Sequence, residues 1–142
     1  MAYNILIVDD STPMRAVIKK VIRASGFDIG TFFESANGAE ALSTLDENWL
    51  DLVLTDYNMP DMDGLLLLKK MKADDCMKTI PVVMVTTEGS HERVDDFLAH
   101  GAAAYIRKPF TPEAIRQTLN NLLGEPENEP DSVDEGDEGL DF

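Results

Sequence analysis

The chain has 142 residues and a formal net charge of −15, which is concentrated toward the C-terminal end. Residues 125–142 hold nine Asp or Glu and no Lys or Arg, and the rest holds 18 acids against 12 bases. This length predicts one domain with a self-sufficient core, and the acidic balance disfavours nucleic-acid binding. Because we find no signal peptide, no long apolar stretch and only the lone Cys76, we expect a cytoplasmic protein without membrane insertion.

The first expected element is a strand at 4–8, "NILIV", which runs directly into Asp9 and Asp10. An unbroken aliphatic run is typical of a strand that is covered on both faces, as in a parallel sheet. Thr12 followed by Pro13 is typical of a helix N-cap with proline at the first helical position, so a helix should begin there. On this pattern alone, the paired carboxylates could simply help to cap that helix.

Further apolar runs at 29–33, 51–55, 81–85 and 103–106 alternate with stretches of helical spacing. The apolar faces of the expected helices consist of Val17, Ile18, Val21 and Ile22; Ala39, Leu42 and Leu45; Leu65, Leu68 and Met71; Val94, Phe97 and Leu98; and Ile115, Leu119 and Leu122. Gly101 and Gly124 should end the last two helices, and Leu66 should be exposed. Five strands alternating with five helices predict an α/β fold with a parallel sheet.

Residues 125–142 read "EPENEPDSVDEGDEGLDF" and follow the expected domain, residues 1–124. Like charge and few apolar residues predict a disordered tail, because such a segment buries too little surface to offset its ordering entropy. Two interpretations stay open. The segment either solubilises the protein or docks, as a short acidic motif, on a partner or on the domain itself.

Polar side chains follow the expected strands at the points where they end. They are Asp9, Asp10, Asp56, Thr86 and Lys108. In open parallel sheets, ligands bind at the carboxyl ends of the strands. Unrelated helix caps would hardly place these residue types at matching positions of several strands. The pattern therefore favours a common site over the capping interpretation.

The charges of this expected site call for a cation. Three carboxylates within about 5 Å repel each other by about 3 kcal/mol per pair at an effective dielectric near 20, and Lys108 offsets only part of this. An all-oxygen site with carboxylates suits Mg²⁺, so Asp9 and Asp10 are expected as metal ligands or as holders of its waters. Asp56 then suits a phosphoryl acceptor that forms an aspartyl phosphate, with the metal and Lys108 stabilising the transferring group.

The segments "VDDSTPMR", "LTDYNMPDMDG", "VMVTTEG" and "AYIRKPF" occur in this order within residues 4–123. In this order and spacing, the chain resembles the receiver domains of two-component response regulators, and most closely the single-domain CheY-like chemotaxis type. The resemblance implies a flavodoxin-like doubly wound (βα)5 fold with a five-stranded parallel sheet of order 2-1-3-4-5. It also implies that a sensor histidine kinase phosphorylates Asp56 and that the protein is a monomer.

The resemblance assigns roles to the residues at the strand ends. It implies Mg²⁺ binding by Asp10, Asp56 and the backbone carbonyl of Asn58, with Asp9 acting through water. Thr86 would hydrogen-bond one phosphoryl oxygen and Lys108 would pair with another, while Tyr105 would be an aromatic switch that turns inward. In physical terms, a phosphoryl group adds roughly two negative charges and three acceptors, and the shift of Thr86 toward it vacates space that Tyr105 can fill.

The resemblance also implies a cis peptide between Lys108 and Pro109, and close backbone packing at Gly64. The output face would be the fourth helix, the fifth strand and the fifth helix, with contacts at Ala103, Tyr105 and Arg107. A downstream protein would bind there.

Asn58 and Glu88 match the chemotaxis type at the positions that influence loss of the phosphoryl group. We therefore expect comparatively rapid self-dephosphorylation. A phosphorylated form that lasts for hours with Mg²⁺ present would refute this expectation.

Other functions remain open at this point. The receiver could be a phosphotransfer intermediate or phosphate sink, or a docking domain that acts without phosphorylation. A Mg²⁺-dependent phosphatase of the haloacid dehalogenase type would carry D-x-D-x-T where this chain has "DDSTP". A flavin electron carrier would need a phosphate loop rich in Ser, Thr and Gly, because carboxylates repel the flavin phosphate. The phosphatase and the flavin electron carrier therefore fit the sequence less well than a phosphorylation-controlled binding module.

Overall fold

The structure is a computed structural model that describes residues 2–87 and 89–124. Within these residues, strands and helices alternate along the chain: β1 (Tyr3–Val8), α1 (Thr12–Ala24), β2 (Ile29–Ser35), α2 (Gly38–Glu47), β3 (Leu52–Thr55), α3 (Gly64–Lys72), β4 (Val82–Thr86), α4 (His91–Ala99), β5 (Ala104–Arg107) and α5 (Pro112–Leu123). The strands pair in parallel in the order β2-β1-β3-β4-β5. This confirms the predicted flavodoxin-like α/β architecture.

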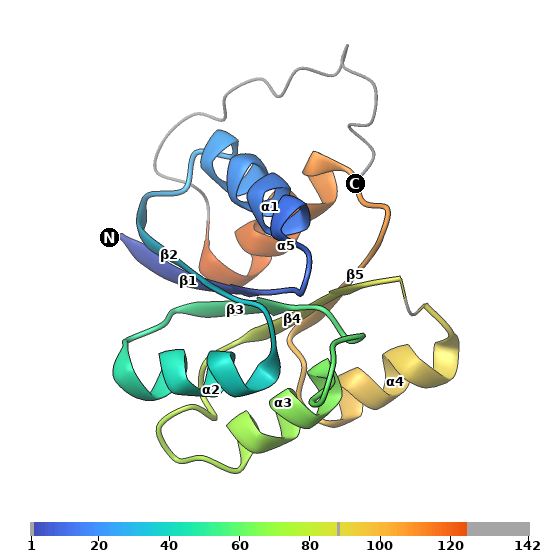
Figure 1. Ribbon diagram of the computed structural model, residues 1–142. Helices are drawn as coiled ribbons and strands as arrows, with labels where there is room; N and C mark the ends of the chain where they lie inside the picture. The colour runs from blue at the N-terminus through green and yellow to red at the C-terminus, as the bar shows by residue number, and fades with distance from the viewer. Residues whose placement is uncertain (1, 88, 125–142) are drawn as a thin grey trace.

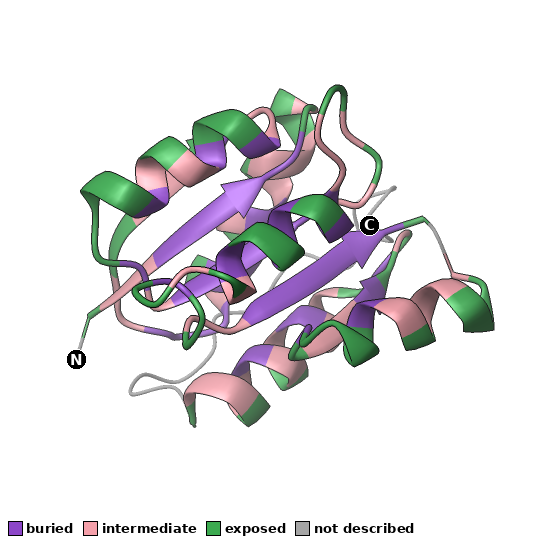
Figure 2. Cartoon of the chain, turned by 90° about the horizontal axis from the view of Figure 1, so that it is seen from below, coloured by how far each residue is buried: buried purple, intermediate pink, exposed green. Residues whose placement is uncertain are grey.

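Helices cover both faces of the sheet, with α1 and α5 on one side and α2, α3 and α4 on the other (Figure 1). Successive residues of β1 serve the two layers in turn, because side chains of a strand alternate between its faces. Ile5 and Ile7 belong to the apolar cluster with α1 and α5, whereas Leu6 and Val8 belong to the cluster with the other helices. The three central strands, β1, β3 and β4, are accordingly buried along most of their length, whereas the outer strands β2 and β5 are for the most part only partly buried or exposed (Figure 2).

The start of α1 differs by one residue from the prediction. Ser11 is the N-cap: its backbone is extended, and its side chain accepts a hydrogen bond from the amide of Met14. Thr12 is the first helical residue and Pro13 the second, so the predicted N-cap role of Thr12 is wrong. Both hydroxyl residues can cap a helix, and only the backbone conformation distinguishes them.

Helix faces were predicted correctly in part. Leu66 is exposed as predicted, but Leu98 is 48% exposed and Ala39 is exposed, which corrects two assignments. In α2 the sheet-facing residues are Ala41 and Leu45, one helical turn apart. In α4, Phe97 faces the sheet, so Leu98 is turned about 100° away from it.

The last two helices end at glycines, as predicted. Gly101 follows α4 with a φ of 101°, and Gly124 follows α5 with a φ of 85°. No helix in residues 2–87 and 89–124 is long and apolar enough to cross a membrane. The predicted acidic tail, residues 125–142, lies outside the described residues.

Candidate functional site: an acidic cluster at the carboxyl edge of the sheet

The parallel pairing of β1 and β3 brings the acidic residues together. Val8 and Thr55 are partners in the register, and each is followed by an aspartate, Asp9 and Asp56. The amide of Asp56 donates a hydrogen bond to the carbonyl oxygen of Val8 at 2.9 Å. Asp9, Asp10 and Asp56 each offer a carboxylate oxygen within 4.8 Å of the others. The structure thus places these predicted residues in one cluster.

Lys108 reaches this cluster from the end of β5. Its Nζ lies 2.7 Å from Oδ2 of Asp9 and 3.2 Å from Oδ2 of Asp56, so the ammonium bridges the two carboxylates. The side chains are only 3% and 12% exposed for Asp9 and Asp56 respectively, and 12% for Lys108. Low exposure reduces solvent screening, so these charges interact strongly. The peptide between Lys108 and Pro109 is cis, as the resemblance implied.

Backbone groups hold the remaining carboxylate oxygens. The amide of Ser11 donates to Oδ1 of Asp9 at 2.8 Å, and the amide of Asn58 donates to Oδ1 of Asp56 at 3.3 Å. The helix cap itself is Ser11, so Asp9 does not fill the capping role that the sequence left open. Its carboxylate instead joins the turn after β1 to Lys108.

Glycine at position 64 permits a close approach to the loop that follows β3 and begins with Asp56. A Cβ built on Gly64 would lie 2.3 Å from the carbonyl oxygen of Asp56, which is far inside van der Waals contact. The amide of Gly64 donates to the carbonyl oxygen of Tyr57 at 2.8 Å. The predicted close packing at Gly64 is therefore present, and it positions the start of α3 against the Asp56 loop.

Thr86 and Tyr105 lie on the neighbouring strands β4 and β5. Thr86 is fully buried at the end of β4, and its carbonyl oxygen accepts a hydrogen bond from the amide of Lys108 at 2.9 Å. Tyr105 pairs with Met84 in the register and is partly buried. Both predicted switch residues thus lie on β4 and β5, and Lys108 directly follows β5. Glu88, which was predicted to affect dephosphorylation, lies outside the described residues.

A run of aromatic rings, which the sequence did not reveal, links the loop after β3 to Tyr105. Tyr57 directly follows Asp56, and its ring centroid lies 5.4 Å from that of Phe97. Phe97 in turn lies 6.2 Å from the ring of Tyr105. The guanidinium carbon of Arg93 lies 4.7 Å from the centroid of Tyr57. These rings come from separate segments, so only the folded arrangement shows their contact.

Arg15 is another site neighbour that sequence reasoning missed. Its guanidinium donates to the carbonyl oxygen of Asp9, and its Nε lies 3.1 Å from Oε1 of Glu34. Lys19 approaches the same carboxylate at 2.9 Å. The hydrogen bond from Lys19, opposed in part by burial and assisted by Arg15, holds the pKa of Glu34 below its ordinary value. The sequence position of Arg15, one turn into the helix that follows Asp9, could have indicated this contact.

The donor set fits a hard divalent cation. Three clustered carboxylates repel by about 3 kcal/mol per pair at an effective dielectric near 20, and one ammonium compensates only in part. All the candidate side-chain donors are oxygens, the ligand type that Mg²⁺ prefers. Asp9 is buried and Asp10 exposed, which matches a cation that keeps part of its water shell.

The doubly wound sheet places the carboxylates and Lys108 at the carboxyl ends of its strands, where open α/β folds bind their ligands. Residues 5–120 match the family described as response regulator receiver domain, and the chain belongs to that family. The resemblance inferred from the sequence motifs is thereby confirmed.

Individual relatives agree with this assignment. The chain is 42% identical over 122 residues to chemotaxis protein CheY1 of Helicobacter pylori strain J99, covering 85% of this chain and 97% of that protein. It is 40% identical to the CheY homolog of Campylobacter jejuni strain 81-176, with 85% and 92% covered. The solved structure of chemotaxis response regulator CheY4 of Vibrio cholerae superposes with a TM-score of 0.77 at 31% identity, covering 86% and 99%. The chain is therefore a CheY-like receiver, a class of signalling switches.

Proposed function

We propose that Asp56 accepts a phosphoryl group from a sensor histidine kinase and that the phosphorylated chain then binds a downstream protein. The observation that carries this proposal is the position of Asp56. Its carboxylate lies in the cluster with Asp9 and Asp10, and its Oδ2 is 3.2 Å from the ammonium of Lys108. A nucleophile, a candidate cation site and a positive charge therefore meet at one point.

In the proposed reaction, a carboxylate oxygen of Asp56 attacks the phosphorus of a phosphohistidine. The new O–P bond forms an acyl phosphate, the P–N bond breaks, and the leaving imidazole keeps the electron pair and takes up a proton. Lys108 pairs with an oxygen of the transferring group, which carries negative charge throughout. Thr86, buried at the end of β4, moves toward the phosphoryl group and donates its hydroxyl hydrogen to another of its oxygens.

Mg²⁺ is the proposed cofactor, and it would neutralise charge on the transferring oxygens. Asp10 and Asp56 would hold it together with the backbone carbonyl of Asn58, and Asp9 would act through water. Lys108 already occupies one oxygen of Asp9, which leaves Asp10 as the more accessible carboxylate of the pair.

The proposed output uses the face formed by α4, β5 and α5. Movement of Thr86 toward the phosphoryl group vacates space beside Tyr105, whose ring is linked through Phe97 to Tyr57. A depression of about 500 Å³ between β5 and α5, lined in part by Tyr105 and Arg107, supplies room for a partner's side chains. We place this switch in the cytoplasm and in chemotaxis or motility control, with residues 1–124 as the receiver and 125–142 as an acidic tail.

The test is phosphorylation of the purified chain by acetyl phosphate with Mg²⁺, followed by peptide mapping. We expect the mass increase of one phosphoryl group, located on Asp56, and none in Asp56→Asn. Asp61→Asn is the matched control, because Asp61 is an exposed aspartate in the same loop and should leave the labelling unchanged. Labelling at another residue, or an unlabelled wild type, would contradict the proposal.

A further inference from the structure

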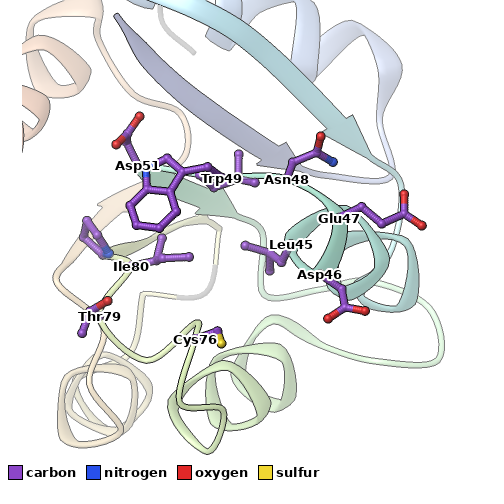
Figure 3. Close-up of a pocket in the computed structure, with 11 residues that line it drawn as sticks. Leu45, Asp46, Glu47, Asn48, Trp49, Asp51, Cys76, Thr79 and Ile80 are labelled. Atoms are coloured by element: carbon purple, nitrogen blue, oxygen red, sulfur yellow. The ribbon is translucent and has the colours of Figure 1, made fainter. Parts of the chain in front are cut away.

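A cavity of about 450 Å³ opens beside the amino ends of β3 and β4, at the edge of the sheet opposite to the one that carries Asp56 (Figure 3). Residues 45–51, at the end of α2 and before β3, form one part of its lining. The segment between α3 and β4 forms the rest, with residues 76 and 79–81. Asp51 precedes β3 whereas Asp56 follows it, so about 16 Å separates the two edges at about 3.3 Å per residue. The cavity is thus distinct from the acidic cluster.

Trp49, the chain's single tryptophan, stands at this cavity and is 79% exposed. Among the described residues it is the most exposed large apolar side chain, ahead of Leu98 at 48%. Its backbone is held in place, because its carbonyl oxygen accepts from Nδ2 of Asn4 at 3.0 Å. Asp51 also exchanges hydrogen bonds with the backbone of Asn4, both at 2.8 Å. The indole ring of Trp49 is therefore exposed to solvent, while hydrogen bonds fix the backbone that carries it.

The chemistry of the cavity is apolar at its base and acidic at its rim. Leu45 and Leu50 are buried, and Ile80 is partly buried beside them. The rim carries Asp46 and Glu47, and neither Lys nor Arg is among the described residues that line the cavity. An occupant that buries apolar surface here and also carries positive charge satisfies both features.

We propose that this surface, the Trp49 pocket, docks a segment of a partner protein that presents an apolar side chain flanked by Lys or Arg. Tryptophan is enriched among the few residues that contribute most of the binding energy in protein interfaces. A small ligand inside the cavity would leave most of the indole in water, whereas a polypeptide can cover it from outside. Because the pocket lies at the edge opposite to Asp56, docking should be independent of phosphorylation.

The fluorescence of Trp49 tests this proposal directly, since its emission comes from the pocket itself. The probe is an amphipathic synthetic peptide of Leu and Lys without aromatic residues. The control peptide has Glu in place of Lys. Both are tested at about 0.15 M salt, which screens distant charges. We expect the Lys peptide to shift the emission of Trp49 to the blue and to protect Cys76, an exposed thiol of the pocket, from alkylation. The Glu peptide should do neither.

Variants then locate the binding. The double variant Asp46→Lys/Glu47→Lys should bind the Lys peptide at least about tenfold more weakly than the wild type. Trp49→Ala should abolish the protection of Cys76 by this peptide. Leu66→Ala, an exposed leucine on α3, and Asp56→Asn should bind like the wild type. The altered side chains of the pocket are exposed, so these variants should fold.

Several results would overturn the proposal. They are equal binding of the two peptides, a Lys peptide that leaves Cys76 fully reactive, and affinity unchanged by charge reversal. If indole alone protects Cys76 while neither peptide does, the pocket belongs to a small ligand and the docking proposal is wrong.

Discussion

Lys108 has opposing effects on the two events proposed at the acidic cluster. Its ammonium lies between Asp9 and Asp56, where it stabilises both carboxylates but also repels any cation that enters. The same charge favours transfer of a phosphoryl group, because the transferring oxygens are negative. Binding of the cation and transfer of the phosphoryl group should therefore respond to Lys108 in opposite directions.

We accordingly predict that Lys108→Met binds Mg²⁺ several-fold more tightly and is labelled by acetyl phosphate roughly tenfold to a hundredfold more slowly, in line with the loss of one electrostatic donor. Calorimetric titration and a labelling time course measure the two effects. Lys70→Met removes an exposed lysine on α3 and should change neither. Weaker Mg²⁺ binding together with unchanged labelling would show that Lys108 does not act as proposed.

Gly64 shows how one missing Cβ supports the site. Alanine there would place a methyl group 2.3 Å from the carbonyl oxygen of Asp56 and 3.0 Å from the Cα of Tyr57. Because these are backbone atoms, the acceptor loop itself must shift. We predict that Gly64→Ala destabilises the protein by about 1–3 kcal/mol, the range for overpacked sites, as measured by denaturant unfolding. Leu66→Ala on the exposed side of the same helix should cost much less, and equal losses would contradict the argument.

At the scale of elements, Glu34 ties β2 to α1 through Lys19 and Arg15. The hydrogen bond from Lys19 and the contacts of Arg15 lower the pKa of Glu34 from its ordinary value of 4.5. A carboxyl group whose pKa is lower in the folded state stabilises the fold fully above its unfolded pKa. That contribution is lost as the pH falls through the folded value.

We therefore predict that Glu34→Gln lowers the free energy of unfolding by at most about 1 kcal/mol near neutral pH, because the pair is partly exposed. The difference from wild type should shrink as the pH falls below 4.5 and should also decrease with added salt. Urea unfolding at a series of pH values measures it. Glu47→Gln, at an exposed glutamate, is the control; a deficit that grows on acidification would reverse the assigned sign.

The elements also show which expectations the sequence can support. Continuous apolar runs identified the central strands β1, β3 and β4, because a strand covered on both faces needs apolar residues at nearly every position. The start of α1 was displaced because Ser11 and Thr12 are both good caps. Leu98 was misplaced because neighbouring apolar residues on a helix point about 100° apart, and only the packing of Phe97 decides which one is buried.

For the whole molecule, the position of the acidic cluster followed from topology. Parallel strands carry their carboxyl ends to one edge, so Asp9 and Asp56 could be placed together before the structure was known. Contacts between distant segments could not be anticipated. The aromatic run from Tyr57 to Tyr105 and the exposed indole of Trp49 depend on how loops and helices meet in space. Periodicity carries no information on such contacts.

The opposite edges of the sheet therefore have separate chemistry. One edge carries clustered carboxylates and Lys108, and the other carries the Trp49 pocket. We assign the proposed phosphorylation to the first edge and the proposed constitutive docking to the second. Failure of the peptide experiments would leave the phosphorylation proposal intact, because the residues tested at the two edges are different.

The most direct test of the central claim is the rate of labelling at Asp56 as a function of Mg²⁺ concentration, in the wild type and in Asp10→Asn. We expect the wild-type rate to saturate with Mg²⁺ and to fall to background when a chelator is added. Asp10→Asn should need at least about tenfold more Mg²⁺, since it loses one charged oxygen ligand. Labelling of Asp56 at the full rate in the presence of the chelator would contradict the claim that a divalent cation makes this carboxylate a phosphoryl acceptor.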